Sequence, residues 1–224
     1  MPFQLIHITL QYSNAVLLAT LPHVSDFAKK LELPIPIPIT TNHVQKFQPW
    51  RTAYDVGGWL TLTNGYQFWF AHGNVDTFRT PRNFFVAQDP DKISEFYGHL
   101  KMNRKEALKM ARDTIKKLGY SEKTFLEGLR LEISGPPHSG TNVIPFYRLE
   151  WFDSDPVSPK IHFEIDAENK RVVGLFYSNP KFFRPEPKID VPVELEADYQ
   201  KRIRGNTNLI YRTNAPQKLP KSPP

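Results

Sequence analysis

NRKEALKMARDTIKKLGY, residues 103–120, is the stretch that decides the fold. Asn103 can accept hydrogen bonds from the first turn of a helix, and Glu106, three residues later, can return one to complete a capping box. Gly119 can end the helix, because glycine takes the left-handed C-terminal position without strain. Between these ends, apolar residues recur three or four positions apart, at Leu108, Ala111, Ile115 and Leu118. The stretch therefore predicts an amphipathic helix, whose basic opposite face is interpreted as solvated, with phosphate contact as the alternative.

After this helix, the period of the apolar residues changes to two, which is typical of strands with one buried face. The alternating segments are residues 129–133, 147–151, 161–165 and 171–177. A polar turn, DAENK at residues 166–170, separates the last two segments, and we expect Asn169 to take a positive φ there. The apolar faces should pack on the helix, leaving the charged faces to solvent or to a partner.

The amino-terminal half begins with a second helix candidate at residues 14–31, capped by Ser13 or Asn14. Pro22 lies inside this segment, which predicts a kink or two short helices. Residues 33–39 then alternate with prolines, so we expect an extended arm whose isoleucines lie against the core. A proline-rich ligand for the aromatic groove of a partner is the alternative interpretation.

A hairpin is predicted at Asn64-Gly65, a pair typical of two-residue turns. The strand candidates around it are residues 59–62, 66–70 and 75–79. In the second of these, Phe68 and Phe70 face one way and Trp69 faces the other. Trp69 marks a contact surface unless a neighbouring segment covers it.

Both halves follow the order helix then strands, which suggests an internal repeat. Their ends are similar as well, PRNFF at residues 81–85 and PKFF at residues 180–183. We predict an α+β fold of two units, each a helix packed on a short antiparallel sheet. The predicted parts are residues 1–98, residues 99–184, and a proline-rich basic arm at residues 185–224, extended and partly disordered, with a short helix at residues 194–204.

Composition limits the class of protein. The 224 residues include no cysteine, which excludes disulfides, cysteine nucleophiles and thiolate metal sites. The formal net charge of +6 equals the six basic residues beyond residue 198, so it belongs to the tail. Such a tail could bind nucleic acid or an anionic surface, although a solvated tail is the interpretation we prefer. Residues 1–24 lack an export signal and no run is long enough to cross a bilayer, so we expect a soluble chain; an exported protein whose native start lies upstream is the alternative.

Candidate catalytic residues are few. His162, Glu164 and Asp166 alternate along one strand and are residue types suited to metal binding or acid–base chemistry. Alternate residues on a strand lie about 6–7 Å apart, and the pattern supplies no further ligands. Cross-strand pairing with Arg148 or Arg130 explains them as well. We therefore predict no catalytic residue, no cofactor site and no metal site.

His138 and Ser139 follow two prolines in a loop between strands. Adjacent residues do not have the geometry of a nucleophile and its base, so a proline-stiffened turn is the simpler interpretation. Phosphate-loop and dinucleotide fingerprints are also missing from the sequence.

Residues 106–120, 147–151, 161–167 and 171–173 together resemble the PepSY module, within the wider set of cystatin-like helix-on-sheet folds. In that family a short alanine-containing helix precedes the strands, and the third strand closes on an Asp-Ala turn before a valine-rich strand. The resemblance covers residues 103–177, the first half being a divergent copy, and Asn169 stands where the family often has glycine. It implies two cystatin-like halves and a non-catalytic, commonly extracytoplasmic module that binds or restrains a peptide or protein. It carries over no catalytic residues.

The sequence thus predicts a non-catalytic binding or regulatory module that contacts a peptide or protein through the polar sheet face or a groove between the halves. The candidate contact residues are Trp69, Arg148, Glu150, His162 and Glu164. One alternative is a hydrolase or metal-dependent enzyme between the halves, which requires His162, Glu164 or His138 to cluster with further polar groups in a concave site. Another is a binder of anionic surfaces or nucleic acid through residues 199–224.

Overall fold

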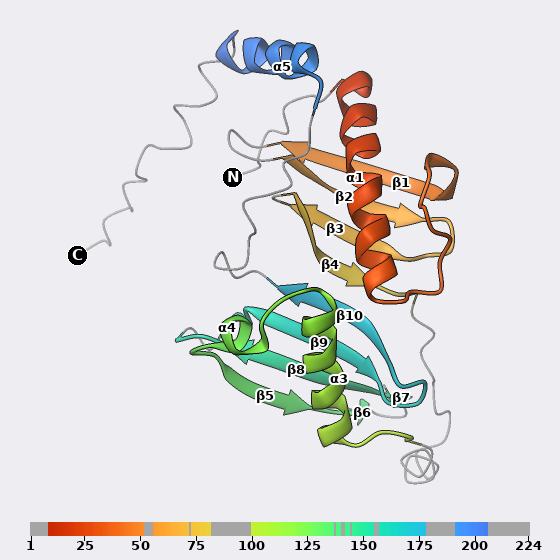
Figure 1. Cartoon of the computed structure of the whole chain (residues 1–224), viewed down its shortest axis with the longest axis vertical. Coiled ribbons are helices and arrows are strands. Elements are labelled where there is room, and N and C mark those ends of the chain that lie inside the picture. The colour runs from red at the N-terminus through yellow and green to blue at the C-terminus, as the bar shows by residue number, and fades with distance from the viewer. Residues whose placement is uncertain are drawn as a thin grey trace, which may run out of the picture.

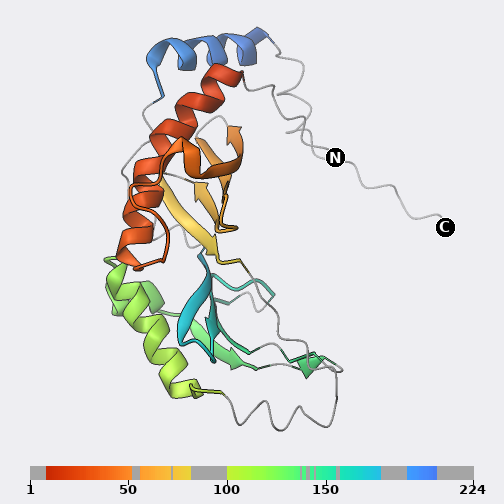
Figure 2. The same cartoon turned by 90° about the vertical axis from the view of Figure 1, so that its right-hand side faces the viewer.

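One antiparallel sheet of eight strands organises the chain, and α1 and α3 both lie on the same face of it (Figures 1 and 2). The computed structural model describes residues 9–51, 56–71, 73–81, 100–136, 138–139, 142–143, 145–154, 157–177 and 191–205. The helices are α1 (Leu10–Lys30), α3 (Arg104–Lys117), α4 (Glu122–Leu126) and α5 (Val193–Gly205), with a 3-10 turn at Thr41–His43. The strands are β1 (Val44–Arg51), β2 (Val56–Leu62), β3 (Gln67–Ala71), β4 (Asn74–Arg79), β5 (Arg130–Ser134), β8 (Phe146–Phe152), β9 (Ile161–Asp166) and β10 (Arg171–Tyr177), and a separate ribbon of β6 (His138–Ser139) and β7 (Asn142–Val143).

The predicted fold of two cystatin-like helix-on-sheet units is wrong, because the strands of both halves belong to one sheet. The strand order is β1-β2-β3-β4-β10-β9-β8-β5, so β4 and β10 join the halves through antiparallel pairing. Either strand alone would leave a row of backbone N–H and C=O groups unpaired on one side, and pairing satisfies both rows. The predicted boundaries at residues 98/99 and 184/185, and the similar PRNFF and PKFF ends, fall largely outside the described residues.

The register of the sheet builds a continuous apolar layer beneath the helices. One residue from each strand contributes to a single cross-strand row. From β1 to β5 the row is Phe47, Leu60, Phe68, Phe78, Leu175, Phe163, Leu149 and Ile133. The six central members are buried, whereas Phe47 and Ile133 on the two edge strands are half-buried. Side chains directly opposite one another in neighbouring strands pack together, so this row connects the core of one half to the core of the other.

The helix predicted from residue 103 is confirmed as α3, with its capping box. Asn103 Oδ1 accepts from the backbone N–H groups of Lys105 (2.9 Å) and Glu106 (3.1 Å), and the N–H of Asn103 donates to Glu106 Oε2 (2.8 Å). Gly119 (φ 86°) ends the helix as expected. The buried stripe comprises Ala107, Ala111, Thr114, Ile115 and Leu118. It includes Ala107 and Thr114, which were not predicted to be part of it. Leu108 is only half-buried.

The other predicted helix is α1, which begins earlier than expected and is continuous. Thr9, and not Ser13 or Asn14, caps its amino terminus, with Thr9 Oγ1 accepting from the N–H of Tyr12 at 3.2 Å. The helix runs through Pro22 without division into two, which corrects that part of the prediction. The following arm packs in part as predicted, since Ile35 and Ile39 are buried, but Ile37 between them is exposed.

The remaining elements divide into predicted and unpredicted ones. The strands predicted in both halves are present as β2–β5 and β8–β10, and the helix predicted at residues 194–204 is present as α5. Three features were not predicted, namely β1, α4 and the β6–β7 ribbon. β1 was not predicted because it contains Pro49, and proline usually indicates that a segment is not a strand. An edge strand tolerates proline because one of its sides needs no partner. Within the described ranges, none of the helices combines the length and apolar character needed to cross a bilayer.

Candidate functional site

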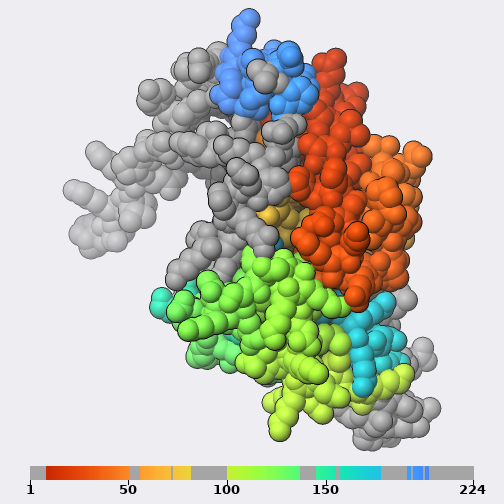
Figure 3. Space-filling view, in the orientation of Figure 1, coloured from red at the N-terminus to blue at the C-terminus, as the bar shows by residue number. Residues whose placement is uncertain are grey.

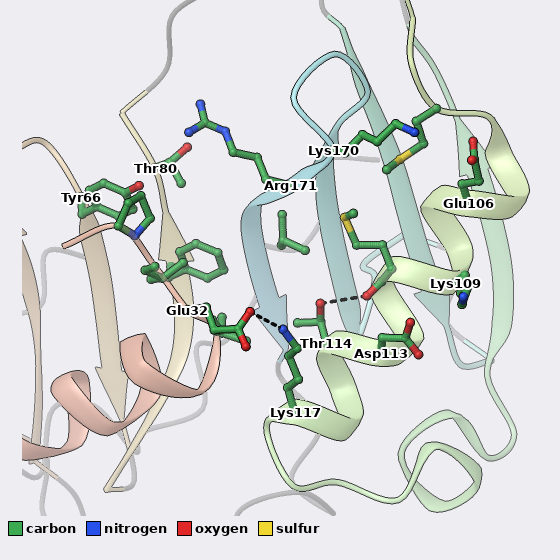
Figure 4. Close-up of a pocket in the computed structure, with 17 residues that line it drawn as sticks. Glu32, Tyr66, Thr80, Glu106, Lys109, Asp113, Thr114, Lys117, Lys170 and Arg171 are labelled. Carbon is green, nitrogen blue, oxygen red and sulfur yellow. Dashed lines mark hydrogen bonds and ion pairs between the residues drawn. The ribbon is translucent and has the colours of Figure 1, made fainter. Parts of the chain in front are cut away.

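A groove of about 550 Å³ lies between the carboxyl end of α1 and α3, over the junction of β4 and β10 (Figure 4). We call it the interhelix groove. In the space-filling view, the lower end of α1 (red to orange) and α3 (yellow-green) abut on this face (Figure 3). Its lining residues are Leu31, Glu32, Leu33, Pro34, Tyr66, Phe78, Thr80, Met102, Glu106, Lys109, Met110, Asp113, Thr114, Lys117, Lys170, Arg171 and Val172. Both halves therefore contribute to one concave surface.

The surface that the interhelix groove offers to a ligand is largely apolar at its base. Leu33, Met110 and Val172 are half-buried, so part of each side chain stays accessible within the groove. Phe78 and Met102 are buried beneath them. Methionine is flexible and polarizable and adapts to irregular apolar partners. A base of this kind favours apolar side chains over a single small polar ligand.

Charged residues of both signs surround this base. Lys117 Nζ contacts Glu32 Oε2 at 2.7 Å, and this ion pair joins α3 to the end of α1 at one side of the groove (Figure 4). Among the described residues, Lys109, Asp113 and Lys170 have no ion-pair partner. The groove can therefore offer cations and an anion to a bound molecule without first breaking an ion pair.

The turn between β9 and β10 carries two cations of the groove, Lys170 and Arg171. Asp166 is buried and accepts from the N–H of Glu168 (3.0 Å) and from the N–H of Asn169 (2.9 Å). Lys170 takes the left-handed conformation (φ 51°), so the prediction of a positive φ at Asn169 was wrong by one residue. Arg171 Nε lies 3.5 Å from Asp166 Oδ2, which holds this arginine at the groove.

Tyr66 lines the groove from the turn after β2. Burial raises the pKa of the Tyr66 phenol above its usual value, and the nearby charge of Arg171 partly offsets this rise. The phenol therefore stays protonated at neutral pH and can donate as well as accept a hydrogen bond.

Four of the five predicted contact residues form a cluster on the opposite face of the sheet. His162 Nδ1 lies 3.1 Å from Glu150 Oε1, and His162 Nε2 lies 3.6 Å from Glu164 Oε1. Arg148 Nε lies 3.9 Å from Glu164 Oε1, which agrees with the cross-strand pairing proposed from the sequence. We call these four residues the charged cluster. They are brought together by the register of β8 and β9, in which Arg148 faces Glu164 and Glu150 faces His162.

The fifth predicted contact residue, Trp69, lies on the same face as the charged cluster but apart from it. A second cross-strand row connects Trp69, Thr77, Phe176, His162 and Glu150. Three strand spacings of roughly 4.8 Å each separate Trp69 from His162. Trp69 instead contacts Trp50 (ring centroids 6.0 Å apart) and Trp59 (5.5 Å), and it is half-buried. Whether any of the five residues contacts a partner stays a prediction.

The groove residues themselves were not predicted from the sequence as a site. Lys109 and Lys117 were interpreted only as part of the basic helix face, and Met110 was not singled out. One signal was available, because Met110 follows Ala107 by three residues and so borders the stripe of small residues on α3. Glu32 gave no comparable signal, because its role depends on the position of α1.

The interhelix groove does not contain the residues that an enzyme at this position was expected to use. His162 and Glu164 lie on the other face of the sheet, and the described residues that line the groove include no histidine. In the part of the chain that the structure describes, no three His, Cys, Asp or Glu residues are grouped so that they could hold a metal ion. The side chain of His138 lies outside the described part. No family model, curated protein or solved structure matches this chain.

Proposed function

We propose that this protein is a non-catalytic binding or regulatory module that holds an extended segment of a peptide or protein in the interhelix groove. The observation that carries the proposal is the lining of that groove, where accessible apolar side chains of both halves are surrounded by charges of both signs. Its volume of about 550 Å³ falls within the range of roughly 300–1,000 Å³ that ligand sites occupy. The resemblance of residues 103–177 to the PepSY module supports the same class of function.

Three features favour a peptide over a small metabolite. Met102 and Met110 can adapt to apolar side chains of different shapes. Tyr66 keeps its phenolic proton near neutral pH and can bond to a backbone carbonyl. Lys109 and Lys170 can attract carboxylates of the bound segment, while Asp113 can attract a cation. A chain of alternating apolar and charged residues would use all three features at once.

Selection of peptides from a random library displayed on phage would test the proposal, with the full chain as bait. Selected peptides should bind Met110→Glu at least tenfold more weakly than wild type, because the new carboxylate enters the apolar base of the groove. Leu18→Glu is the matched control, since it places the same charge on an exposed residue of α1 (59% exposed) away from the groove. Binding to that variant should be unchanged.

The composition of the chain allows the site to be located independently. There are three methionines, Met1, Met102 and Met110, and two of them line the groove. With 13C-methyl methionine, a selected peptide should shift the NMR signals of Met102 and Met110 and leave Met1 unchanged. A library that yields no binding peptide, or peptides that bind Met110→Glu as tightly as wild type, would contradict the proposal. Peptides that shift only the indole signals of Trp59 and Trp69 would place the site on the other face of the sheet.

A further inference from the structure

β5 is an edge strand whose outer side has no backbone partner among the described residues. It pairs with β8 over Arg130–Ser134, and no other strand of the sheet contacts it (Figure 1). The pairing with β8 is regular, without a bulge, and the five residues of β5 include no proline. A row of free N–H and C=O groups on a regular strand is a template for another strand.

The other edge of the sheet differs in ways that oppose strand addition. β1 contains Pro49, which has no N–H to donate, and its register shifts between Val44 and Lys46. Prolines and bulges are the devices by which proteins protect exposed edges. Because β5 has neither, the two edges are not equivalent.

The sequence of β5 is complementary to itself in one antiparallel register. If a second copy pairs with β5 about a two-fold axis at Leu131, Arg130 faces Glu132 of the second copy and Glu132 faces its Arg130. Leu129 then faces Ile133 of the second copy, and both are half-buried in the isolated chain. A register shifted by two residues, with the axis at Glu132, would instead place two glutamates opposite one another, which is unfavourable.

The neighbours of Glu132 within the chain favour a cation on its free side. Glu132 lies opposite Glu150 in the pairing of β5 with β8, so two carboxylates are adjacent across these strands. Glu150 has His162 on its other side, at 3.1 Å, whereas within the described part of the chain the ion-pair partner of Glu132 is Arg130 of its own strand. Arg130 and Glu132 are both exposed, with 60% and 49% of their side-chain surfaces accessible. An arginine from a second copy would place a cation beside these two adjacent carboxylates.

We propose that two copies of this chain associate through β5, antiparallel and about a two-fold axis at Leu131, so that their sheets become continuous. The proposal is independent of the interhelix groove, which lies at the other end of the β10-β9-β8-β5 half of the sheet. The interface is short, so we expect a dimer that dissociates on dilution. Its charge pairs should also make association weaker at high salt.

Analytical ultracentrifugation of the full chain over a range of concentrations tests this proposal. Wild type should associate reversibly to a dimer, and Arg130→Glu and Glu132→Arg should each weaken association at least tenfold by opposing like charges. The double variant Arg130→Glu/Glu132→Arg should recover association, because the exchanged charges are again complementary. Circular dichroism of each variant confirms that the fold is kept. A monomer at all concentrations, or single variants that associate like wild type, would overturn the proposal.

Cysteine cross-linking tests the register, and the chain is suited to it because it has no cysteine of its own. Leu131→Cys places the same residue of both copies at the two-fold axis, where Cβ atoms lie about 4.5–5.5 Å apart, near disulfide distance. Ser134→Cys, three residues away on β5, should not cross-link with itself. A mixture of Arg130→Cys and Glu132→Cys should form a disulfide between the two variants in preference to either with itself. Equal cross-linking at residues 131 and 134 would indicate random collision and contradict the interface.

Discussion

Phe78 of β4 lies directly opposite Leu175 of β10, and this pair joins the apolar layers of the two halves of the sheet. Both side chains are buried, and Phe78 also contacts the ring of Phe27 on α1, with centroids 5.6 Å apart. The pair therefore connects a helix of the first half to a strand of the second. Disturbing it should affect the whole chain, not one half of it.

Phe78→Ala should lower the free energy of unfolding by about 3–5 kcal/mol, because it leaves a cavity in the shared core. Urea unfolding followed by far-ultraviolet circular dichroism measures this, and the loss should occur in a single transition. Leu18→Ala, at an exposed residue of α1, is the control and should change stability by less than about 0.5 kcal/mol. Two separate transitions, with only one altered by Phe78→Ala, would show that the halves fold independently.

Removal of the α3 cap should have a smaller effect. Asn103→Ala leaves the N–H groups of Lys105 and Glu106 without their side-chain acceptor, and should cost about 1 kcal/mol. Asn103→Asp keeps an acceptor at the same position and should retain most of the wild-type stability. The midpoints of urea unfolding distinguish the two variants. If both lost the same stability, the cap would not be the cause.

Two adjacent glycines in β2 should respond differently to alanine. A Cβ at Gly57 would overlap the ring of Trp50 and the backbone carbonyl of Phe70, and the carbonyl cannot move without disturbing β3. A Cβ at Gly58 would lie 2.6–2.8 Å from the outer ring atoms of Phe47, a half-buried side chain that can shift. Gly57→Ala should therefore destabilise by about 1–3 kcal/mol and Gly58→Ala by less.

Thermal unfolding of both variants measures this difference. Trp50→Ala combined with Gly57→Ala should not restore stability, because the contact with the Phe70 carbonyl remains. A rescued double variant would show instead that the indole is the main obstacle at this position.

His23 should make the folded chain less stable in mild acid. Burial lowers the pKa of this imidazole below its ordinary value of 6.5, although the charge of Asp26 partly offsets the effect. The unfolded chain thus takes up this proton at a higher pH than the folded chain does. The stability contributed by neutral His23 is present above a pH of about 6.5 and is lost as the pH falls below it.

Urea midpoints measured from about pH 7.5 to about pH 5 test this effect in wild type and in His23→Gln. The glutamine does not titrate, so the variant should lose less stability over this interval than wild type. Identical pH profiles of the two proteins would show that other groups determine the acid sensitivity.

Much of the local structure could be predicted because its causes lie within a few residues. The cap at Asn103, the helix end at Gly119 and the hairpin at Asn64-Gly65 all depend on neighbours in the chain, and all are present. Local rules were less reliable where tertiary contacts compete with them. Pro22 does not divide α1, and Pro49 lies within the edge strand β1, which the local pattern did not reveal.

The candidate site was less accessible to such reasoning. The charged cluster follows from alternation along β8 and β9, so its four residues and the cross-strand pairing of Arg148 could be proposed, though not the contact of His162 with Glu150. The interhelix groove could not be named, because Glu32, Lys117 and Val172 become neighbours only when α1, α3 and β10 are assembled. Met110 lines the groove beside the buried Ala107 and Ala111 of α3, and which side of this helix faces the sheet depends on packing in the assembled chain.

The sequence by itself determined the helices α1, α3 and α5, most of the strands and the face that these strands bury, because periodicity and capping act over short separations. Only the tertiary structure decided that β4 pairs with β10, which made one sheet where two were expected. The physical reason is that backbone hydrogen bonds between strands are nearly independent of side-chain identity. Any two free edges of suitable length can satisfy each other, and the choice between them depends on the packing of the whole chain.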